Sequence, residues 1–225
     1  MMRGPSAGSA TPTRETGRVE AFTDGVFAIA ITLLVLDLPI PTSGNFAGSL
    51  AEHWPSFLAY AAAFFTLAAI WVHHHALFAQ IRRVEPPVLL LNLLLLLGIS
   101  LLPWPTSLIA MAIQDGNHLD GVIACGLFAA ASLIVMCGWL GLSIVLAHRP
   151  HLLVEDSGVE WMRSNAREVL VAGIPVVLAA AAAFLNPALA LALFIAVPIY
   201  FFYSTSRVRS RPDPEPADTT PGERR

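Results

Sequence analysis

Residues 18–37 read RVEAFTDGVFAIAITLLVLD, an apolar run long enough to cross a lipid bilayer as one helix. Similar runs recur along the 225-residue chain, in which 56% of the residues are hydrophobic and only 13% are charged. A soluble domain is about one quarter charged, and one with so few charges would expose large apolar patches. The composition therefore argues against a soluble enzyme, a nucleic-acid-binding protein and a disordered protein. It predicts an all-α, polytopic membrane protein.

Six apolar segments are expected to form transmembrane helices, because the short alternating segments of a membrane barrel are absent from the sequence. They comprise residues 19–38, 55–81, 86–113, 119–147, 164–185 and 187–206. Only Asn186-Pro187 separates the last two segments, which should therefore form a tight antiparallel hairpin. Residues 18–206 are thus expected to form one transmembrane domain. The polar tails 1–17 and 207–225 are expected to be disordered on the cytoplasmic side.

The basic residues predict the orientation of these segments. All 13 are arginines, and they fall in alternate links and in the two tails. The links that carry them contain Arg82, Arg83, Arg149, Arg163 and Arg167. The charged residues in and beside the opposite links are all acidic, namely Asp37, Glu52, Asp115 and Asp120. Under the positive-inside rule, we expect a multi-pass protein of the cell membrane with both termini in the cytoplasm.

Asp24 is an unusual residue in the first segment, since a carboxylate one turn into a membrane helix costs about a few kcal/mol unless it is paired. Either the positive end of the helix dipole or a partner in the bundle would offset this cost. At about 100° per residue, Asp24 falls about 140° from Ile29 on a helical wheel. Ile29 belongs to a stripe of Phe22, Gly25, Val26, Ile29, Thr32, Leu33 and Leu36. Periodicity alone would explain this stripe by ordinary helix packing, and the position of Asp24 favours a structural tether over an ion ligand.

Three consecutive histidines, residues 73–75, lie near the end of the second segment. They point about 100° apart on a helix, so they cannot all bind one metal ion, and we expect no metal site. At least one should face the bundle interior, at the same depth as Arg18, Asp24 and Asn92. These polar side chains could satisfy one another's hydrogen bonds and tie three helices together.

Several motifs resemble those of one channel family. The pattern Arg18-x-x-x-Phe22-Thr23-Asp24, which runs directly into the apolar stretch, resembles the signature of the prokaryotic branch of the endolysosomal potassium channel family, transmembrane protein 175. Trp71 with the following histidines, then Asn92, then Leu102-Pro103-Trp104-Pro105-Thr106 are similar to that family in order and spacing. Thr23 stands where the family usually has Ser, a change that keeps the hydroxyl. Segments four to six match the family only in number and length.

This resemblance implies a six-helix subunit that assembles in membrane lipid as a homotetramer, with the first helices lining the pore for potassium ions. It implies that Ile29, Leu33 and Leu36 form the pore constriction and that Thr32 contributes to cation selection. It also implies a structural network that braces the pore helix, consisting of Arg18, Phe22, Thr23, Asp24, Trp71, His73, His74, His75 and Asn92. The helical wheel independently places the constriction residues on one face and Asp24 away from it.

We therefore expect a potassium-permeable cation channel with modest selectivity, without catalytic residues, cofactor or nucleic-acid partner. One alternative is a proton-coupled secondary transporter that uses Asp24 and the His73–His75 cluster as a proton relay. Such transporters often have repeated halves, and the sequence contains no second copy of the Phe22-Thr23-Asp24 pattern. Another alternative, a membrane-embedded metal enzyme using the histidines, lacks a well-spaced ligand partner.

Overall fold

The structure, a computed structural model, describes residues 13–41, 44–155 and 158–196. Within these ranges the chain is built from helices, with one isolated antiparallel β-bridge between Ile81 and Leu153. The helices are α1 (Thr13–Leu33), the 3₁₀-helix η1 (Leu34–Asp37), α2 (Phe46–Glu52), α3 (Trp54–Phe78), α4 (Pro86–Leu101), α5 (Pro103–Gln114), α6 (His118–Ala147), the 3₁₀-helix η2 (Pro150–Leu152) and α7 (Gly158–Ala182). A further short apolar helix comprises Pro187–Ala196.

The expected membrane architecture is confirmed in its main features. Five helical spans among the described residues are long and apolar enough to cross a membrane, with α4 and α5 together forming one of them. The sixth expected segment is described only over residues 187–196, where it is helical. Residues 197–206, like the tail residues 1–12 and 207–225, lie outside the described residues.

Two helices begin earlier than the sequence indicated. Helix α1 begins at Thr13, so the expectation that residues 13–17 belong to a disordered tail is wrong. Helix α7 begins at Gly158 rather than at residue 164, with Glu160 in its first turn. Apolar periodicity detects only the part of a helix that lies in the membrane or core, and a carboxylate near the positive end of the helix dipole favours the polar extension of α7.

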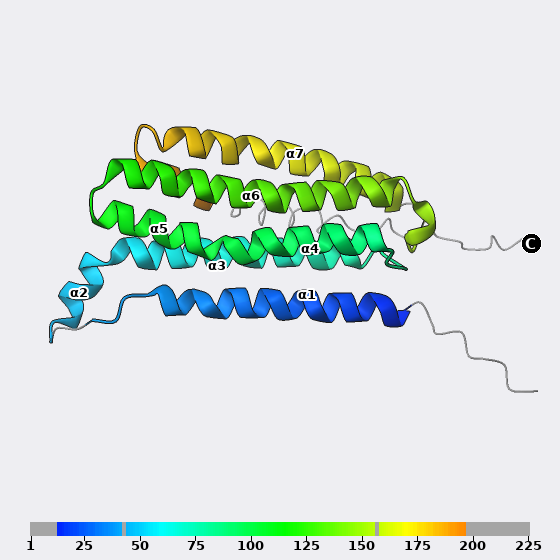
Figure 1. Cartoon of the computed structure of the whole chain (residues 1–225), viewed down its shortest axis with the longest axis horizontal. Coiled ribbons are helices and arrows are strands. Elements are labelled where there is room, and N and C mark those ends of the chain that lie inside the picture. Colours follow the sequence, from blue (N-terminus) through cyan, green and yellow to red (C-terminus); the bar gives the residue numbers. More distant parts are fainter. Residues whose placement is uncertain (1–12, 42–43, 156–157, 197–225) are drawn as a thin grey trace, which may run out of the picture.

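The third expected span is interrupted at Leu102. Helix α4 ends at Leu101 and α5 starts with Pro103. A proline fits the first turn of a helix, but inside a helix it removes one backbone hydrogen bond and clashes with the preceding turn. The two helices therefore continue in roughly one direction as separate elements (Figure 1).

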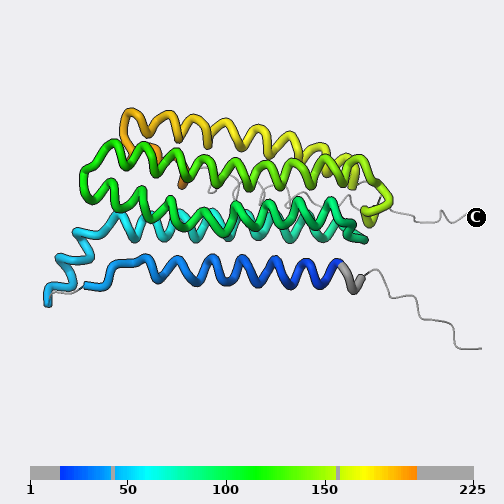
Figure 2. The backbone as a smooth tube through the Cα atoms, in the orientation of Figure 1, coloured from blue at the N-terminus to red at the C-terminus, as the bar shows by residue number. Residues whose placement is uncertain are grey.

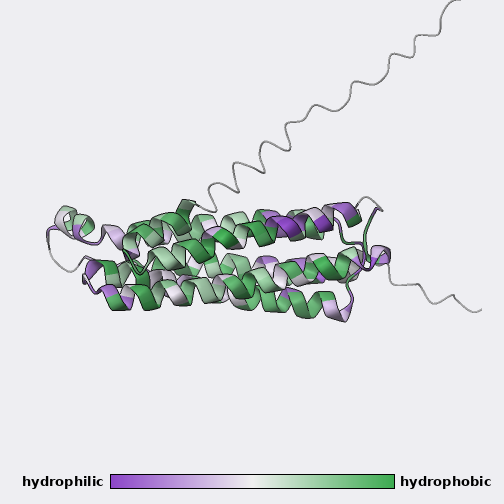
Figure 3. Cartoon of the chain, turned by 90° about the horizontal axis from the view of Figure 1, so that it is seen from above, coloured by the Kyte–Doolittle hydropathy of each residue, from purple (hydrophilic) through white to green (hydrophobic). Residues whose placement is uncertain are grey.

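The helices lie side by side in layers, with α1 at one edge and α7 at the opposite edge (Figure 1). Helix α6 lies between them and packs against α4, α5 and α7. The tube in Figure 2 shows that the long helices run alternately in opposite directions, so the links gather at the two ends of the bundle. Hydrophilic residues also gather toward these ends, while the middle of the bundle is mostly hydrophobic (Figure 3).

Glycines allow α4 and α6 to approach closely. A Cβ atom added to Gly138 of α6 would lie 2.7 Å from the backbone nitrogen of Leu95 in α4. One added to Gly98 of α4 would lie 2.8 Å from the backbone nitrogen of Val135 in α6. Small residues at helix contacts let backbones pack without a side chain between them, which is a main source of helix association in membranes.

At the end of the bundle that carries the arginines, two links are fastened to each other. Arg82 N donates to the carbonyl of Leu152 at 2.8 Å, and Val154 N donates to the carbonyl of Gln80 at 3.0 Å. The guanidinium of Arg82 also donates to the carbonyl of His151 at 3.0 Å. The α3–α4 link is therefore held against the link that leads from α6 to α7.

Glu85 adds side-chain contacts to this junction. Its carboxylate forms an ion pair with Arg149 and a hydrogen bond with His151 Nε2 at 3.3 Å. The hydrogen bond with His151 is the main cause that holds the pKa of Glu85 below its ordinary value of 4.5, and together with the contacts with Arg149 it outweighs partial desolvation, which acts in the opposite direction. The contacts that Glu85 adds to the junction therefore favour its ionised form.

Candidate functional site

Three buried polar side chains join α1, α3 and α4. The side-chain amide of Asn92 donates from Nδ2 to Thr23 Oγ1 at 2.9 Å. Its carbonyl oxygen lies 2.9 Å from His74 Nε2, so His74 is the donor in that contact. Thr23, Asn92 and His74 are almost entirely inaccessible to solvent. In a bundle interior, such a satisfied network fixes the rotation of each helix about its own axis.

Aromatic rings enclose the imidazole of His74. The ring of Phe78 stacks on it at a centroid distance of 4.3 Å. Phe27 of α1 lies 6.0 Å away, and Trp139 of α6 meets it edge-on at 6.4 Å. Because these rings exclude water, the hydrogen bond to Asn92 supplies the polar partner that a buried imidazole requires.

The partner of Asp24 is Trp71, a member of the network that the resemblance implies, and not the Arg18, histidine or Asn92 expected from their depth in the membrane. The Asp24 carboxylate accepts a hydrogen bond from Trp71 Nε1 of α3 at 2.8 Å. The ring of His75 stacks on Trp71 with an angle of 23° between the planes. The tether expected at Asp24 therefore reaches α3 of the same subunit.

The predicted polar cluster thus separates into two neighbouring contacts. His74 and Asn92 come together as expected, but they meet the hydroxyl of Thr23 rather than the carboxylate of Asp24. Among the described residues, no ion pair joins Arg18 to Asp24. Arg18 and Phe22 are exposed, and His73 bonds through Nδ1 to the carbonyl of Ala69. The separation follows from the wheel angle of about 100° between Thr23 and Asp24, which directs them toward different helices.

Helix α1 presents one face to the bundle and another away from it. Phe27, Ala30 and Leu34 are buried against the other helices. The exposed fractions of Ile29, Leu33 and Leu36 are 60%, 52% and 74%, and on the helical wheel these residues are centred about 110° from the buried face. The apolar stripe is therefore not explained by packing within this subunit.

The 3₁₀ turn at the end of α1 aligns two stripe residues. In a 3₁₀-helix, side chains three residues apart eclipse each other, whereas in an α-helix they are offset by about 60°. Leu36 follows Leu33 through η1 and therefore projects on the same line. The sequence provided no signal for this change of helix type.

Thr32 lies among these exposed apolar residues with its hydroxyl bonded to its own helix. Its Oγ1 lies 2.9 Å from the carbonyl oxygen of Ala28 and 3.0 Å from that of Ile29, and it donates to them. A hydroxyl that donates its single proton to the backbone keeps both oxygen lone pairs available. Thr32 can therefore offer an oxygen ligand to a cation.

A contact just beyond the C-terminal end of α1 was not anticipated from the sequence. Ser107 of α5 donates to Asp37 Oδ2 at 2.7 Å, which ties the end of the 3₁₀ turn to the third span. The sequence places both residues near the same membrane boundary, but nothing in it pairs them. This contact restrains the carboxylate at the end where the stripe terminates.

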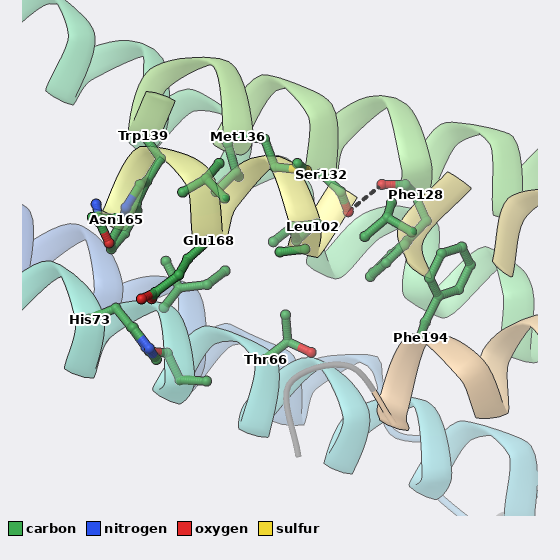
Figure 4. Close-up of a pocket in the computed structure, with 16 residues that line it drawn as sticks. Thr66, His73, Leu102, Phe128, Ser132, Met136, Trp139, Asn165, Glu168 and Phe194 are labelled. Carbon is green, nitrogen blue, oxygen red and sulfur yellow. Dashed lines mark hydrogen bonds between the residues drawn. The ribbon is translucent and has the colours of Figure 1, made fainter. Parts of the chain in front are cut away.

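A largely apolar cavity of about 180 Å³ lies between α3, α6 and α7 (Figure 4). Its walls include Phe128, Val135 and Met136 of α6, while His73 of α3 and Glu168 of α7 are polar lining residues. Within the described ranges, no group of three or more His, Cys, Asp or Glu side chains could hold a metal ion. The cavity therefore offers a mainly apolar space within the subunit.

Comparisons with known proteins agree with the resemblance in the first three segments. Residues 18–103 match the family model described as endosomal/lysosomal potassium channel TMEM175. A protein of Streptomyces collinus named a potassium channel is 38% identical over 130 residues, which cover 56% of this chain and 63% of that protein. The bovine endosomal/lysosomal proton channel TMEM175 is 39% identical over 137 residues, which cover 54% of this chain and 28% of that protein. The chain thus spans less than two thirds of the length of these relatives.

A solved structure extends the similarity beyond the family model. It is the crystal structure of a lysosomal potassium-selective channel TMEM175 homolog from Chamaesiphon minutus, which is 29% identical in sequence. The superposition has a TM-score of 0.71 and covers 85% of this chain and 98% of the other. The later helices, which carry no family motif, therefore follow the same fold.

Proposed function

We propose that this chain, whose residues 18–103 match the TMEM175 family model, forms a potassium-permeable cation channel whose ion path is lined by α1. The observation that carries the proposal is the exposed apolar face of α1 at one edge of the bundle (Figure 1). A homotetramer would bring four copies of this face to a common axis and cover it. Passive ion movement along that axis requires no catalytic residue and no cofactor.

The constriction in this proposal consists of rings of Ile29, Leu33 and Leu36. Bulky apolar rings oppose ion passage by excluding water and by requiring the ion to lose part of its hydration shell. The 3₁₀ turn supports this role for the last two rings, since it stacks Leu36 directly after Leu33. Thr32 lies next to these rings with free oxygen lone pairs. Its hydroxyl oxygen would replace a water molecule that a potassium ion loses in the constriction.

The contacts in the N-terminal half of α1 would fix the rotation of this pore helix about its own axis. The Thr23–Asn92–His74 network and the Asp24–Trp71 hydrogen bond both attach α1 to the body of the subunit. A small rotation of α1 would remove Ile29 from the axis, so these contacts would affect conduction without touching the ion. Arg18, Phe22, His73 and His75 would contribute less directly, through the surface and stacking positions described above.

The distribution of charge supports an orientation for the channel. With the arginine-bearing end in the cytoplasm, Asp37 and the negative end of the α1 dipole would lie at the outer mouth and attract cations. Both termini would then be cytoplasmic, in a protein of the cell membrane. Cysteine substitutions at Asp115 and Arg83 test this, because only the first should react with an impermeant thiol reagent added outside. The opposite labelling pattern would contradict the orientation.

A flux assay separates the channel from the proton-coupled transporter. The full chain would be reconstituted in liposomes, and potassium uptake would be driven by a membrane potential at equal pH on both sides. We expect uptake without a proton gradient, and a lower rate for sodium. A strict requirement for a proton gradient would contradict the channel and favour the transporter. The geometry supports the channel, since the Asp24 carboxylate bonds to Trp71 while His74 bonds to Asn92.

A further inference from the structure

The outer side of α7 carries an apolar stripe that no other described helix covers. Its five members are each more than half exposed, and they are Leu170, Val171, Ile174, Val177 and Leu178. At about 100° per residue they fall within an arc of about 120°. A continuous apolar face of this kind requires an apolar neighbour.

Acyl chains of the membrane fit this requirement. Helix α7 packs against α6 and lies at the edge of the bundle opposite to α1 (Figure 1). If α1 faces the common axis of the proposed channel, α7 lies on the perimeter of the assembly. The stripe then meets lipid rather than another subunit.

Two arginines extend the same stripe at one end. Arg163 and Arg167 are one turn apart, and they share the helical face of Leu170 and Ile174 within an arc of about 60°. Both are exposed, and in the described part of the chain neither guanidinium has an ion-pair partner. Glu160 lies near the same face, whereas the exposed Glu168, next to Arg167 in the chain, lies about 100° further round the helix. The face itself therefore carries two arginines and one glutamate.

The start of α7 is what brings these groups onto one face. A helix that began at residue 164 would leave Arg163 in a link of undefined direction. The structure starts α7 at Gly158, so both arginines are helical. Arg167 then lies about 4.5 Å along the axis from Leu170, less than one helical turn before the apolar stripe begins.

We propose that this α7 lipid face, formed by Arg163, Arg167 and the apolar stripe, binds an anionic phospholipid. The phosphate would contact both guanidinium groups, whose planar donors suit phosphate oxygens, and an acyl chain would lie along Leu170, Ile174 and Val177. Basic residues at the end of a membrane helix attract anionic lipids, and each contributes about a factor of five in binding. The lipid would anchor the polar start of α7 at the membrane surface.

Native mass spectrometry of the purified full chain tests this proposal. Phosphatidylglycerol and phosphatidylcholine with identical acyl chains would be titrated separately, and the lipid bound per subunit would be counted. We expect tighter retention of phosphatidylglycerol by the wild type. Arg163→Gln should reduce that preference roughly fivefold, and the double change Arg163→Gln/Arg167→Gln roughly 25-fold.

Matched variants make the result specific. Arg83→Gln removes an exposed arginine from another link at the same end and should leave the preference unchanged, while Glu160→Gln should maintain or increase it. The double lysine variant, Arg163→Lys/Arg167→Lys, should retain most of the preference if folding is intact. An equal loss in Arg83→Gln would overturn the proposal in favour of general surface charge. Full displacement of the lipid by glycerol phosphate would replace it with a simple anion site.

This readout does not involve ion flux. If the wild-type protein conducts potassium but shows no preference for phosphatidylglycerol, the lipid proposal alone would be contradicted. Retained preference in a protein without flux would leave the lipid site supported and contradict the proposed channel instead.

Discussion

Asn92 of α4 donates to the hydroxyl of Thr23 in α1 across a buried contact of 2.9 Å. The two residues are 69 positions apart in the chain, and their bond connects the first and third membrane spans. Since the same amide also accepts from His74, one side chain determines how three helices face each other.

Replacement of Asn92 should therefore destabilise the subunit. Asn92→Ala would leave His74 Nε2 without its buried acceptor, a loss that costs about 1–3 kcal/mol. We expect a lower thermal midpoint of the detergent-solubilised protein. Ser100→Ala on the same helix is the control, because Ser100 is exposed and bonds only to its own helix at Leu97. Equal midpoints for the two variants would show that the network does not stabilise the fold.

The Asp24–Trp71 hydrogen bond leads to a graded prediction. Asp24→Asn keeps an acceptor oxygen for Trp71 Nε1, whereas Asp24→Ala removes it. We expect the alanine variant to be less stable by about 1 kcal/mol or more and to show a smaller oligomer fraction in size-exclusion chromatography than the asparagine variant. Both variants should keep the wild-type potassium preference. A stable Asp24→Asn oligomer with a changed reversal potential would instead place Asp24 at the ion path.

Ile29 should control conductance if α1 lines the pore. Ile29→Asn would convert an apolar ring into a polar one that keeps the constriction wet. Single-channel recording should show a larger conductance and a weaker preference for potassium over sodium.

Val35 provides the matched control for Ile29. It is also apolar and half exposed, but in η1 it points about 120° from Leu36 and away from the stripe. Val35→Asn should therefore change the current little. If an assembled Ile29→Asn channel kept the wild-type conductance and reversal potential, Ile29 would not lie on the ion path.

The close contact of α4 with α6 predicts a steric effect. Gly138→Ala would place a methyl group 2.7 Å from the backbone nitrogen of Leu95, and overpacking of this kind costs about 1–3 kcal/mol. Gly126→Ala on the same helix should be neutral or slightly stabilising, since a Cβ there meets nothing within 4 Å. Thermal unfolding of both variants provides the measurement, and equal midpoints would mean that the two helices can separate without cost.

Glu85 predicts a pH dependence at the arginine-bearing end. Its pKa is lower in the folded protein than the ordinary 4.5, so its contribution to stability is fully present above that value. The contribution is lost as the pH falls through the lower folded value, because protonation ends the ion pair with Arg149.

The comparison with Glu85→Gln isolates this effect. The wild type should be the more stable protein at about pH 6, and the difference should shrink toward about pH 3. A difference in thermal midpoint that is constant over this interval would show that the Glu85 carboxylate does not contribute through its charge.

The sequence by itself determined the membrane class, the positions of most spans and the placement of the link arginines at one end of the bundle. These are local properties, since a span needs only a long apolar run and the charges mark its ends. The motif at Arg18 to Asp24 and its resemblance to one channel family were also readable along the chain. The wheel could place Ile29 and Asp24 on different faces, because both lie on one helix of known geometry.

Only the tertiary structure decided which side chains meet. Thr23, His74 and Asn92 come from three helices, and their contact depends on the rotation and depth of each helix in the bundle. A change of one residue in register rotates a helical side chain by about 100°, so sequence order could not distinguish Thr23 from Asp24 as the partner of Asn92. The early start of α7 escaped prediction for a related reason. The first turns of α7 are polar and follow no apolar period, although they bring Arg163 and Arg167 onto the same face as the apolar stripe of α7.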